Sequence, residues 1–361
     1  MLTATLPILA IIARFLTIAS DIPGARDILH TAEVITLAGA VGPESLAFDP
    51  NGEGPYTGVA DGRILKWQGH SLGWTEFAYT APQRKDCIRP FAPEIEHICG
   101  RPLGLRFHPK TGDLYIADAY LGLHKVGSKG GLSTKLISSF ENEPFVLTND
   151  LDIDEEKNII YFTVTSAVYQ RRQFVHAILS MDTTGRLMKY DIKTGEVKVL
   201  STGIPFANGV ALSKDRSFLL VAATTTSKIQ RYWLQGPNAG SWDVFAKLQG
   251  HPDNIRRNSK GEFWVALHSK DSIASKFAVS NPWLGRFLLK LPLSYKQLHF
   301  MTIGMKTYAV AVKLSDEGEI IDVLEDSEGK SLKYLSEVEE RDGELWIGSV
   351  IMPFIGRLKL N

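Results

Sequence analysis

Short polar motifs recur along the chain at places where apolar strands begin or end. They are Gly42-Pro43-Glu44-Ser45, Thr148-Asn149-Asp150, Ala207-Asn208-Gly209, Pro252-Asp253-Asn254-Ile255, Ala266-Leu267-His268 and Leu335-Ser336-Glu337. The first four motifs carry hard oxygen donors, and a hard cation such as Ca2+ binds about 6–8 oxygens from carboxylates, carbonyls and water. We therefore predict that one Ca2+ ion is held by Glu44, Asn149, Asn208, Asp253 and Asn254.

An alternative interpretation is that each Asn or Asp only stabilises a turn, as these residues often do. The regular placement of the set favours a shared centre, because buried carboxylates and amides need partners. His268 follows the apolar run 263–267 and should lie near the same opening. Histidine can transfer a proton near neutral pH, so His268 and Glu44 are the candidate catalytic residues. A partly exposed histidine at a strand end is the alternative for His268.

The elements that must position these residues form a repeating unit of apolar strands joined by Asp, Gly and Lys turns. Six units recur about every 40–60 residues, the spacing of propeller blades. They start near Glu44, Leu103, Asn149, Asn208, Asn254 and Ala311. We predict an all-β fold, a six-bladed β-propeller over residues 21–361, in which the segment 34–37 completes the last blade and removes an exposed sheet edge.

Residues 271–306 interrupt this pattern. Apolar residues at 283, 284, 287, 288 and 291 lie on one helical face, and Pro292 would end that helix. We predict a short helical cap over one end of the channel. Simple packing between blades five and six is the alternative. The expected substrate pocket is lined by Asp118, Tyr120, Trp283, Phe287, Phe300 and Ser336.

The N-terminal run from Leu2 to Ala19 is apolar, is interrupted by Arg14 and ends in small residues. We predict a signal peptide over residues 1–20, with a signal anchor that tethers the protein to a membrane, or a buried helix, as alternatives. Only two cysteines are present, Cys87 and Cys99. Together with an export signal they favour a disulfide that closes the loop between them.

The composition excludes some classes of partner. The formal net charge is +0, and no basic stripe interleaved with aromatic residues is present. Nucleic acid is therefore not an expected partner. A small-molecule substrate and a monomeric protein are expected.

Several motifs resemble plant strictosidine synthase-like proteins from about Glu33 to the C-terminus. They are the segments 42–49, 56–64, 99–104, 184–187, 232–234 and 261–266. The resemblance implies a six-bladed propeller, a signal peptide and a Cys87–Cys99 disulfide. It also implies passage through the endoplasmic reticulum to the vacuole, or to the extracellular space.

In strictosidine synthase a glutamate near the start of the last blade's strand handles the proton transfers of a Pictet–Spengler condensation. Ser336 falls at that place, and alternation along the strand would turn Glu337 away, so strictosidine formation is not expected. Related paraoxonase-like and gluconolactonase-like hydrolases hold a catalytic calcium, with ligands that resemble the five residues named first. The resemblance therefore favours a calcium-dependent hydrolase of small esters or lactones. The alternatives are a condensing enzyme of alkaloid biosynthesis, with His268 or Glu44 as its acid–base group, and a non-catalytic binding propeller.

Overall fold

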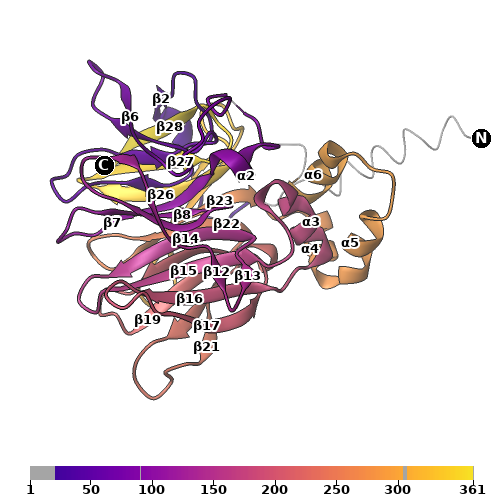
Figure 1. The fold of residues 1–361 in the computed structure, drawn as a ribbon. Coiled ribbons are helices and arrows are strands. Elements are labelled where there is room, and N and C mark those ends of the chain that lie inside the picture. Colours follow the sequence, from indigo (N-terminus) through magenta and orange to yellow (C-terminus); the bar gives the residue numbers. More distant parts are fainter. Residues whose placement is uncertain (1–20, 90, 304–306, 361) are drawn as a thin grey trace, which may run out of the picture.

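The chain forms a six-bladed β-propeller, as the sequence predicts (Figure 1). The computed structural model describes residues 21–89, 91–303 and 307–360. The predicted signal peptide therefore lies outside the described residues. Among these residues, no helix is long and apolar enough to span a membrane.

The first three blades follow one another along the chain, each running from the channel outward. Blade one contains β3 (Leu46–Ala47), β4 (Tyr56–Gly58), β5 (Arg63–Trp67) and β6 (Trp74–Tyr79), with β10 (Gly131–Leu132) parallel to β6 at its outer edge. Blade two contains β7 (Pro102–Phe107), β8 (Leu114–Asp118), β9 (Gly122–Val126) and β11 (Thr134–Ile137). Blade three contains β14 (Leu147–Asp154), β15 (Ile159–Ser166), β16 (Gly185–Asp191) and β17 (Val197–Ile204). The short hairpin of β12 (Ser139–Phe140) and β13 (Glu143–Pro144) precedes blade three.

The remaining three blades complete the ring, and blades five and six each include a strand from the start of the chain. Blade four contains β18 (Ala207–Leu212), β19 (Phe218–Ala223), β20 (Lys228–Trp233) and β21 (Trp242–Lys247). Blade five contains β22 (Gly250–Arg257), β23 (Phe263–Lys270), β24 (Ala309–Leu314) and β25 (Ile320–Asp326), with β1 (Arg26–Asp27) parallel at its edge. Blade six contains β26 (Leu335–Arg341), β27 (Glu344–Ser349), β28 (Phe354–Lys359) and the antiparallel β2 (Glu33–Thr36). The predicted closure by the segment 34–37 is confirmed.

One boundary of the predicted repeat is wrong. The segment that begins at Ala311 does not open the last blade, because it forms β24 and β25, the third and fourth strands of blade five. The helical insertion between β23 and β24 separates the two halves of that blade in the sequence. Blade six therefore begins only at Leu335.

Blade packing explains why the middle strands read as continuous apolar runs. All six residues of β19 are buried, and β8 and β15 are buried almost throughout, because each blade is covered by a neighbour on both faces. The inner strands β3, β7, β14, β18, β22 and β26 contact one another in a closed ring around the channel. The start of each inner strand is therefore brought to a common axis.

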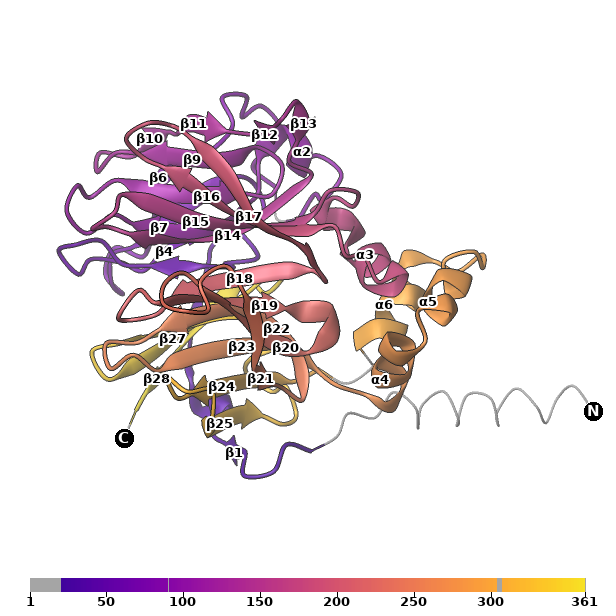
Figure 2. The same ribbon diagram turned by 90° about the horizontal axis from the view of Figure 1, so that it is seen from below.

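The helices gather at one end of the propeller (Figure 2). The insertion forms three short helices in place of the single predicted one: α4 (Ile273–Ser280), α5 (Pro282–Leu288) and α6 (Tyr295–Ile303). Of these, α5 and α6 pack on α3 (Phe174–Ser180), which follows the 3-10 turn η2 (Arg171–Gln173) of blade three, and α4 packs on α5 and α6. The other helical turns are η1 (Leu29–Thr31), α2 (Glu96–Cys99) and η3 (Thr224–Thr226).

Candidate active site at the mouth of the channel

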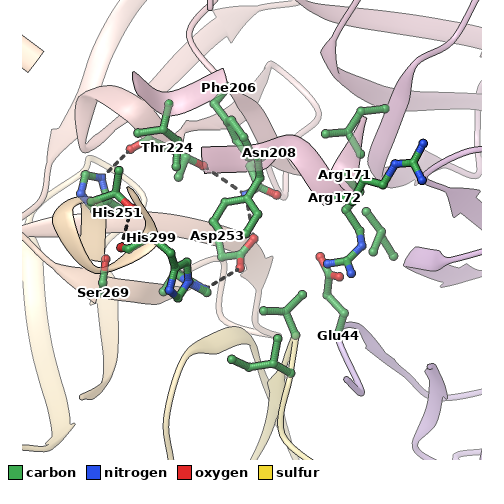
Figure 3. A pocket seen from close by; sticks show the side chains of 18 of the residues that line it. Glu44, Arg171, Arg172, Phe206, Asn208, Thr224, His251, Asp253, Ser269 and His299 are labelled. Atoms are coloured by element: carbon green, nitrogen blue, oxygen red, sulfur yellow. Dashed lines mark hydrogen bonds and ion pairs between the residues drawn. The ribbon is translucent and has the colours of Figure 1, made fainter. Parts of the chain in front are cut away.

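A cavity of about 550 Å³ lies at the helical end of the channel. Its lining includes four of the five predicted metal ligands, namely Glu44, Asn149, Asn208 and Asp253. Apolar side chains such as Leu103, Leu147, Phe174 and Phe206 line it as well, and α6 contributes Tyr295, Lys296, His299 and Thr302. Figure 3 shows Glu44 facing Asp253 and Asn208 across this space. The volume is in the range of cavities that hold small molecules.

β-Bulges place the predicted ligands at this end. The ladder is interrupted between Thr148 and Leu151 in β14, between Ala207 and Val210 in β18, and between Pro252 and Ile255 in β22. Each interruption contains the Asn or Asp of a predicted motif. A bulge changes the direction of its side chains, so neighbours in sequence can reach different parts of the channel.

Gly209 shows why a glycine follows Asn208. A Cβ atom at Gly209 would lie 2.6 Å from the Cα atom of Asn254 on the next inner strand. Any larger residue would push β18 away from β22 and move both bulges. The glycine of the Ala-Asn-Gly motif therefore keeps Asn208 on β18 close to Asn254 on β22.

The amide nitrogens of the three candidate asparagines donate hydrogen bonds to the protein, whereas their amide oxygens accept none. Asn149 Nδ2 donates to Thr165 Oγ1 at 2.9 Å, Asn208 Nδ2 donates to Asp253 Oδ1 at 2.7 Å, and Asn254 Nδ2 donates to Glu337 at 3.2 Å. The Oδ1 atoms of these three asparagines and Oε2 of Glu44 are buried without a hydrogen-bond partner. A buried polar atom without a partner is costly, so four such atoms from one set fit a cation.

The buried charges around Glu44 and Asp253, at the base of the cavity, do not sum to zero. The carboxylates of Glu44, Asp150, Asp253 and Glu337 are buried beside the guanidinium groups of Arg101 and Arg256, while the third nearby guanidinium, that of Arg171, is paired with Glu96. Their formal sum is two negative charges, which a divalent cation would neutralise. Within the described part of the chain, no group of three or more His, Cys, Asp or Glu side chains is placed to hold a metal ion. The candidate set is of another kind, because three of its five members are amides.

The pKa values of the two carboxyls reflect this imbalance. Burial raises the pKa of Glu44 to about 7, although Arg101 at 3.5 Å and Arg171 favour its charged form. Burial, and then the nearby charge of Glu44, raises the pKa of Asp253 well above its usual range. In the metal-free protein both carboxyls therefore resist ionisation.

A cluster of charged and polar side chains contacts Asn254 through Glu337. Arg256 donates to both carboxylate oxygens of Asp150, at 2.6 and 2.9 Å, and pairs with Glu337. Glu337 also accepts from Ser45 Oγ at 3.0 Å. We call Asp150, Arg256, Glu337 and Ser45 the channel cluster. Glu337 is absent from the cavity lining, and its bond to Asn254 leaves the amide oxygen free.

His268 lies beside Asp253, with 3.9 Å between Nδ1 and Asp253 Oδ2. It lines the cavity, and its Nε2 has no hydrogen-bond partner in the described structure. Burial, and then the neighbouring His299 and His251, lower the pKa of His268 to about 3. The imidazole is therefore neutral at physiological pH and can accept a hydrogen bond at Nε2.

Sequence reasoning missed several polar residues of this cavity, among them His251, His299 and Arg171. His251 precedes Asp253 by two positions in β22, but the register shifts on both sides of Pro252, so its closeness in sequence to Asp253, and not strand alternation, was the usable signal. His299 comes from α6 and gave no such signal. Arg171 forms a two-pronged ion pair with the buried Glu96.

The expected pocket residues are placed elsewhere. Trp283 and Phe287 point outward and are 61% and 51% exposed, and Phe300 is exposed as well. The spacing of apolar residues predicted one helix but not which helical face packs against the rest of the protein, because the insertion folds into three helices. Asp118 is buried and accepts from Thr80 Oγ1 at 2.7 Å, and Tyr120 donates to Glu96 at 2.9 Å. None of these five residues is in the cavity lining.

Ser336 is also outside the lining. Its side chain is fully buried and donates to the backbone oxygen of Glu44 at 2.7 Å. It therefore fixes the backbone of a candidate ligand.

The disulfide between Cys87 and Cys99 is confirmed, with the two Cα atoms 5.6 Å apart. The loop that it closes supplies Phe91 and Pro93 to the cavity lining. The cross-link therefore restrains a segment of the cavity wall.

Comparison with known proteins agrees with this architecture. The family model for strictosidine synthase matches residues 149–237, and the model for the N-terminal part of strictosidine synthase-like proteins matches residues 27–67. Protein STRICTOSIDINE SYNTHASE-LIKE 10 of Arabidopsis thaliana is 60% identical over 336 residues, covering 93% of this chain and 90% of the relative. The chain belongs to the strictosidine synthase-like family. Protein STRICTOSIDINE SYNTHASE-LIKE 1 of the same plant is 52% identical, covering 85% of this chain and 77% of the relative.

Solved structures with the same fold include hydrolase-type propellers. A gluconolactonase from Xanthomonas campestris aligns with a TM-score of 0.59 at 12% identity, covering 94% of this chain and 95% of that one. A calcium-binding regucalcin from Agrobacterium tumefaciens aligns with a TM-score of 0.55 at 13% identity, covering 90% and 94%. At these identities the likeness establishes the fold of this strictosidine synthase-like chain and nothing beyond it.

Proposed function

We propose that this protein is a calcium-dependent hydrolase of small, largely apolar esters or lactones. The observation that carries the proposal is the set of four buried oxygens without hydrogen-bond partners, from Glu44, Asn149, Asn208 and Asn254. Glu44, Asn149 and Asn208 line the cavity together with apolar side chains, and Asn254 is adjacent to Asp253 in β22. Asp253 would complete the set. A bound Ca2+ ion would polarise the substrate carbonyl and lower the pKa of a water molecule.

The remaining roles are proposed from the side chains themselves. His268 would accept a hydrogen bond from the attacking water at Nε2, while Asp253 orients the other side of its ring. Ser336 and the channel cluster would hold Glu44 and Asn254 in position. The apolar walls would bind the acyl portion of the substrate and exclude bulk water.

The absence of an acid at Ser336 disfavours the alternative of a Pictet–Spengler condensation. We also propose a secretory route for the protein. The Cys87–Cys99 bond supports it, because disulfides persist mainly in oxidising compartments.

Titration calorimetry and ester or lactone hydrolysis assays on the same EDTA-treated protein test the proposal. We expect stoichiometric Ca2+ binding and hydrolysis only when Ca2+ is restored. Asn208→Ala and Asp253→Ala should abolish both, and the exposed control Asn51→Ala should retain both. Hydrolysis that persists in excess chelator, or turnover of an amine and an aldehyde without hydrolysis, would contradict the proposal. If chelation unfolds the protein and no ester or lactone is turned over when Ca2+ is restored, the ion is structural only.

A further inference from the structure

The outward surface of the cap combines apolar and basic side chains in a repeated pattern. In α4 and again in α5, a large apolar residue is followed three positions later by a cation and four positions later by an aromatic ring. The two runs are Ile273-Lys276-Phe277 and Trp283-Arg286-Phe287. Residues three and four positions apart share one face of a helix, so each run forms a continuous stripe.

These stripes are exposed although the opposite faces of the helices are packed. Ile273, Phe277, Trp283 and Phe287 are 48%, 54%, 61% and 51% exposed. On the inward side, a Cβ atom at Gly285 would lie 1.9 Å from the carbonyl oxygen of Leu179, so α5 already touches α3. The inward face of the cap is therefore packed on the propeller. Its outward apolar side chains remain exposed and can contact another partner.

The charge of the cap has one sign. Residues 272–303 contain Lys276, Arg286, Lys290 and Lys296 and no Asp or Glu. None of these four cations forms an ion pair with a carboxylate among the residues that the structure describes. Aromatic and basic side chains on one helical face are typical of helices that lie in the interface of an anionic bilayer.

The cap lies at the end of the propeller where the cavity opens. Figures 1 and 2 both show α4, α5 and α6 beyond this end, next to α3. Lys296 belongs to the cavity lining, as does Phe91, which is 54% exposed. A surface that covers the cap would therefore also meet the cavity mouth.

We propose that the cap surface, defined by Ile273, Lys276, Phe277, Trp283, Arg286, Phe287 and Lys290, docks on an anionic lipid bilayer. The basic side chains contact the headgroups, and the aromatic rings enter the boundary with the acyl chains. Charge favours this occupant over a second copy of the chain, because two cap surfaces face to face would bring like charges together. Docking places the cavity mouth against the membrane, where apolar substrates concentrate.

Vesicle sedimentation and lipid quenching of tryptophan fluorescence test this with the full chain. We expect binding to vesicles of phosphatidylcholine with phosphatidylserine, weak binding to phosphatidylcholine alone, and release at high salt. Phe277→Ala/Phe287→Ala should weaken binding at least about tenfold, and Arg286→Ala about fivefold. Leu72→Ala and Val244→Ala, which remove equally exposed apolar side chains outside the cap, should bind like the unchanged protein.

Trp283 supplies a direct readout because the other tryptophans lie outside the cap. Brominated lipids should quench the unchanged protein, and Trp283→Phe should lose most of that quenching. Failure of the unchanged protein to bind anionic vesicles would overturn the proposal. Unaltered binding of the Phe277→Ala/Phe287→Ala variant would do the same and would assign binding to residues 1–20. A dimer that dissociates in this variant, without vesicle binding, would assign the surface to a second copy.

Discussion

Replacing Glu44 by glutamine should weaken Ca2+ binding, but at pH 8 it should leave the metal-free protein as stable as the unchanged protein or more stable. The pKa of Glu44 rises from 4.5 to about 7 because the side chain is buried. The stability of the metal-free protein linked to this group is fully present below pH 4.5 and is lost as the pH rises through 7. At pH 8 or above the loss is about 3 kcal/mol. Glutamine matches the neutral form in shape and avoids this loss, but it removes a charged ligand.

Thermal unfolding in EDTA and in CaCl2, at pH 6 and pH 8, measures both effects. In EDTA at pH 8 we expect Glu44→Gln to be as stable as the unchanged protein or more stable, by up to about 3 kcal/mol. The advantage should shrink at pH 6. In Ca2+ at about 100 times the dissociation constant, the unchanged protein should gain about 2.7 kcal/mol, whereas the variant should gain little.

Glu319→Gln, at an exposed position far along the chain, is the control and should respond to Ca2+ like the unchanged protein. Two results would refute the reasoning. One is a Glu44→Gln variant that is markedly less stable in EDTA at pH 8. The other is an equal Ca2+ response in both proteins, which would remove Glu44 from the ion site.

Three further predictions concern the elements that support the site. Arg256→Met should cost about 3–5 kcal/mol in urea unfolding, because Asp150 and Glu337 stay buried without their partner, and adding Asp150→Asn and Glu337→Gln should restore much of it. Burial alone would raise the pKa of Glu340, but bonds from Asn258 and Trp264 and the charge of Lys313 lower it overall. Stability from Glu340 is therefore present above pH 4.5 and lost as the pH falls through the lowered value, so Glu340→Gln should flatten the acid limb of a melting-temperature profile. Gly285→Ala should loosen α5 from Leu179 and speed the amide hydrogen exchange of α5. In Gly127→Ala the added methyl group meets only ordinary contact distances, so the exchange of α5 should not change.

Much of the fold could be predicted because short, continuous stretches of sequence encode the strands and turns of each blade. Period-two strands, Asp-Gly turns and the spacing of units identified the propeller and the closing strand 34–37. The blade-five boundary failed because the insertion of α4, α5 and α6 separates β23 from β24 in sequence, while pairing such as Ala266 with Ala311 joins them in space.

The candidate ligands could be predicted for a related reason. Asn149 and Asn208 occupy equivalent places in successive units, and a closed ring must bring equivalent places to one axis. The sequence repeat aligned Asn254 with them, whereas the strand registers align Asp253. The outward-facing Trp283 and Phe287 could not be placed in this way, because which face of a short helix packs depends on α3 and not on its own periodicity.

The sequence alone determined the blade repeat, the cysteine pair and the oxygen donors that converge on the channel, because these follow from local pattern and ring symmetry. Only the tertiary structure decided which oxygens remain without partners, since that depends on Thr165, Glu337 and Asp253 binding the amide nitrogens across blades. It also decided that Arg256 lies between Asp150 and Glu337, residues far apart in the chain. The balance of buried charge, on which the proposed divalent site depends, is a property of side chains that meet only after the ring has closed.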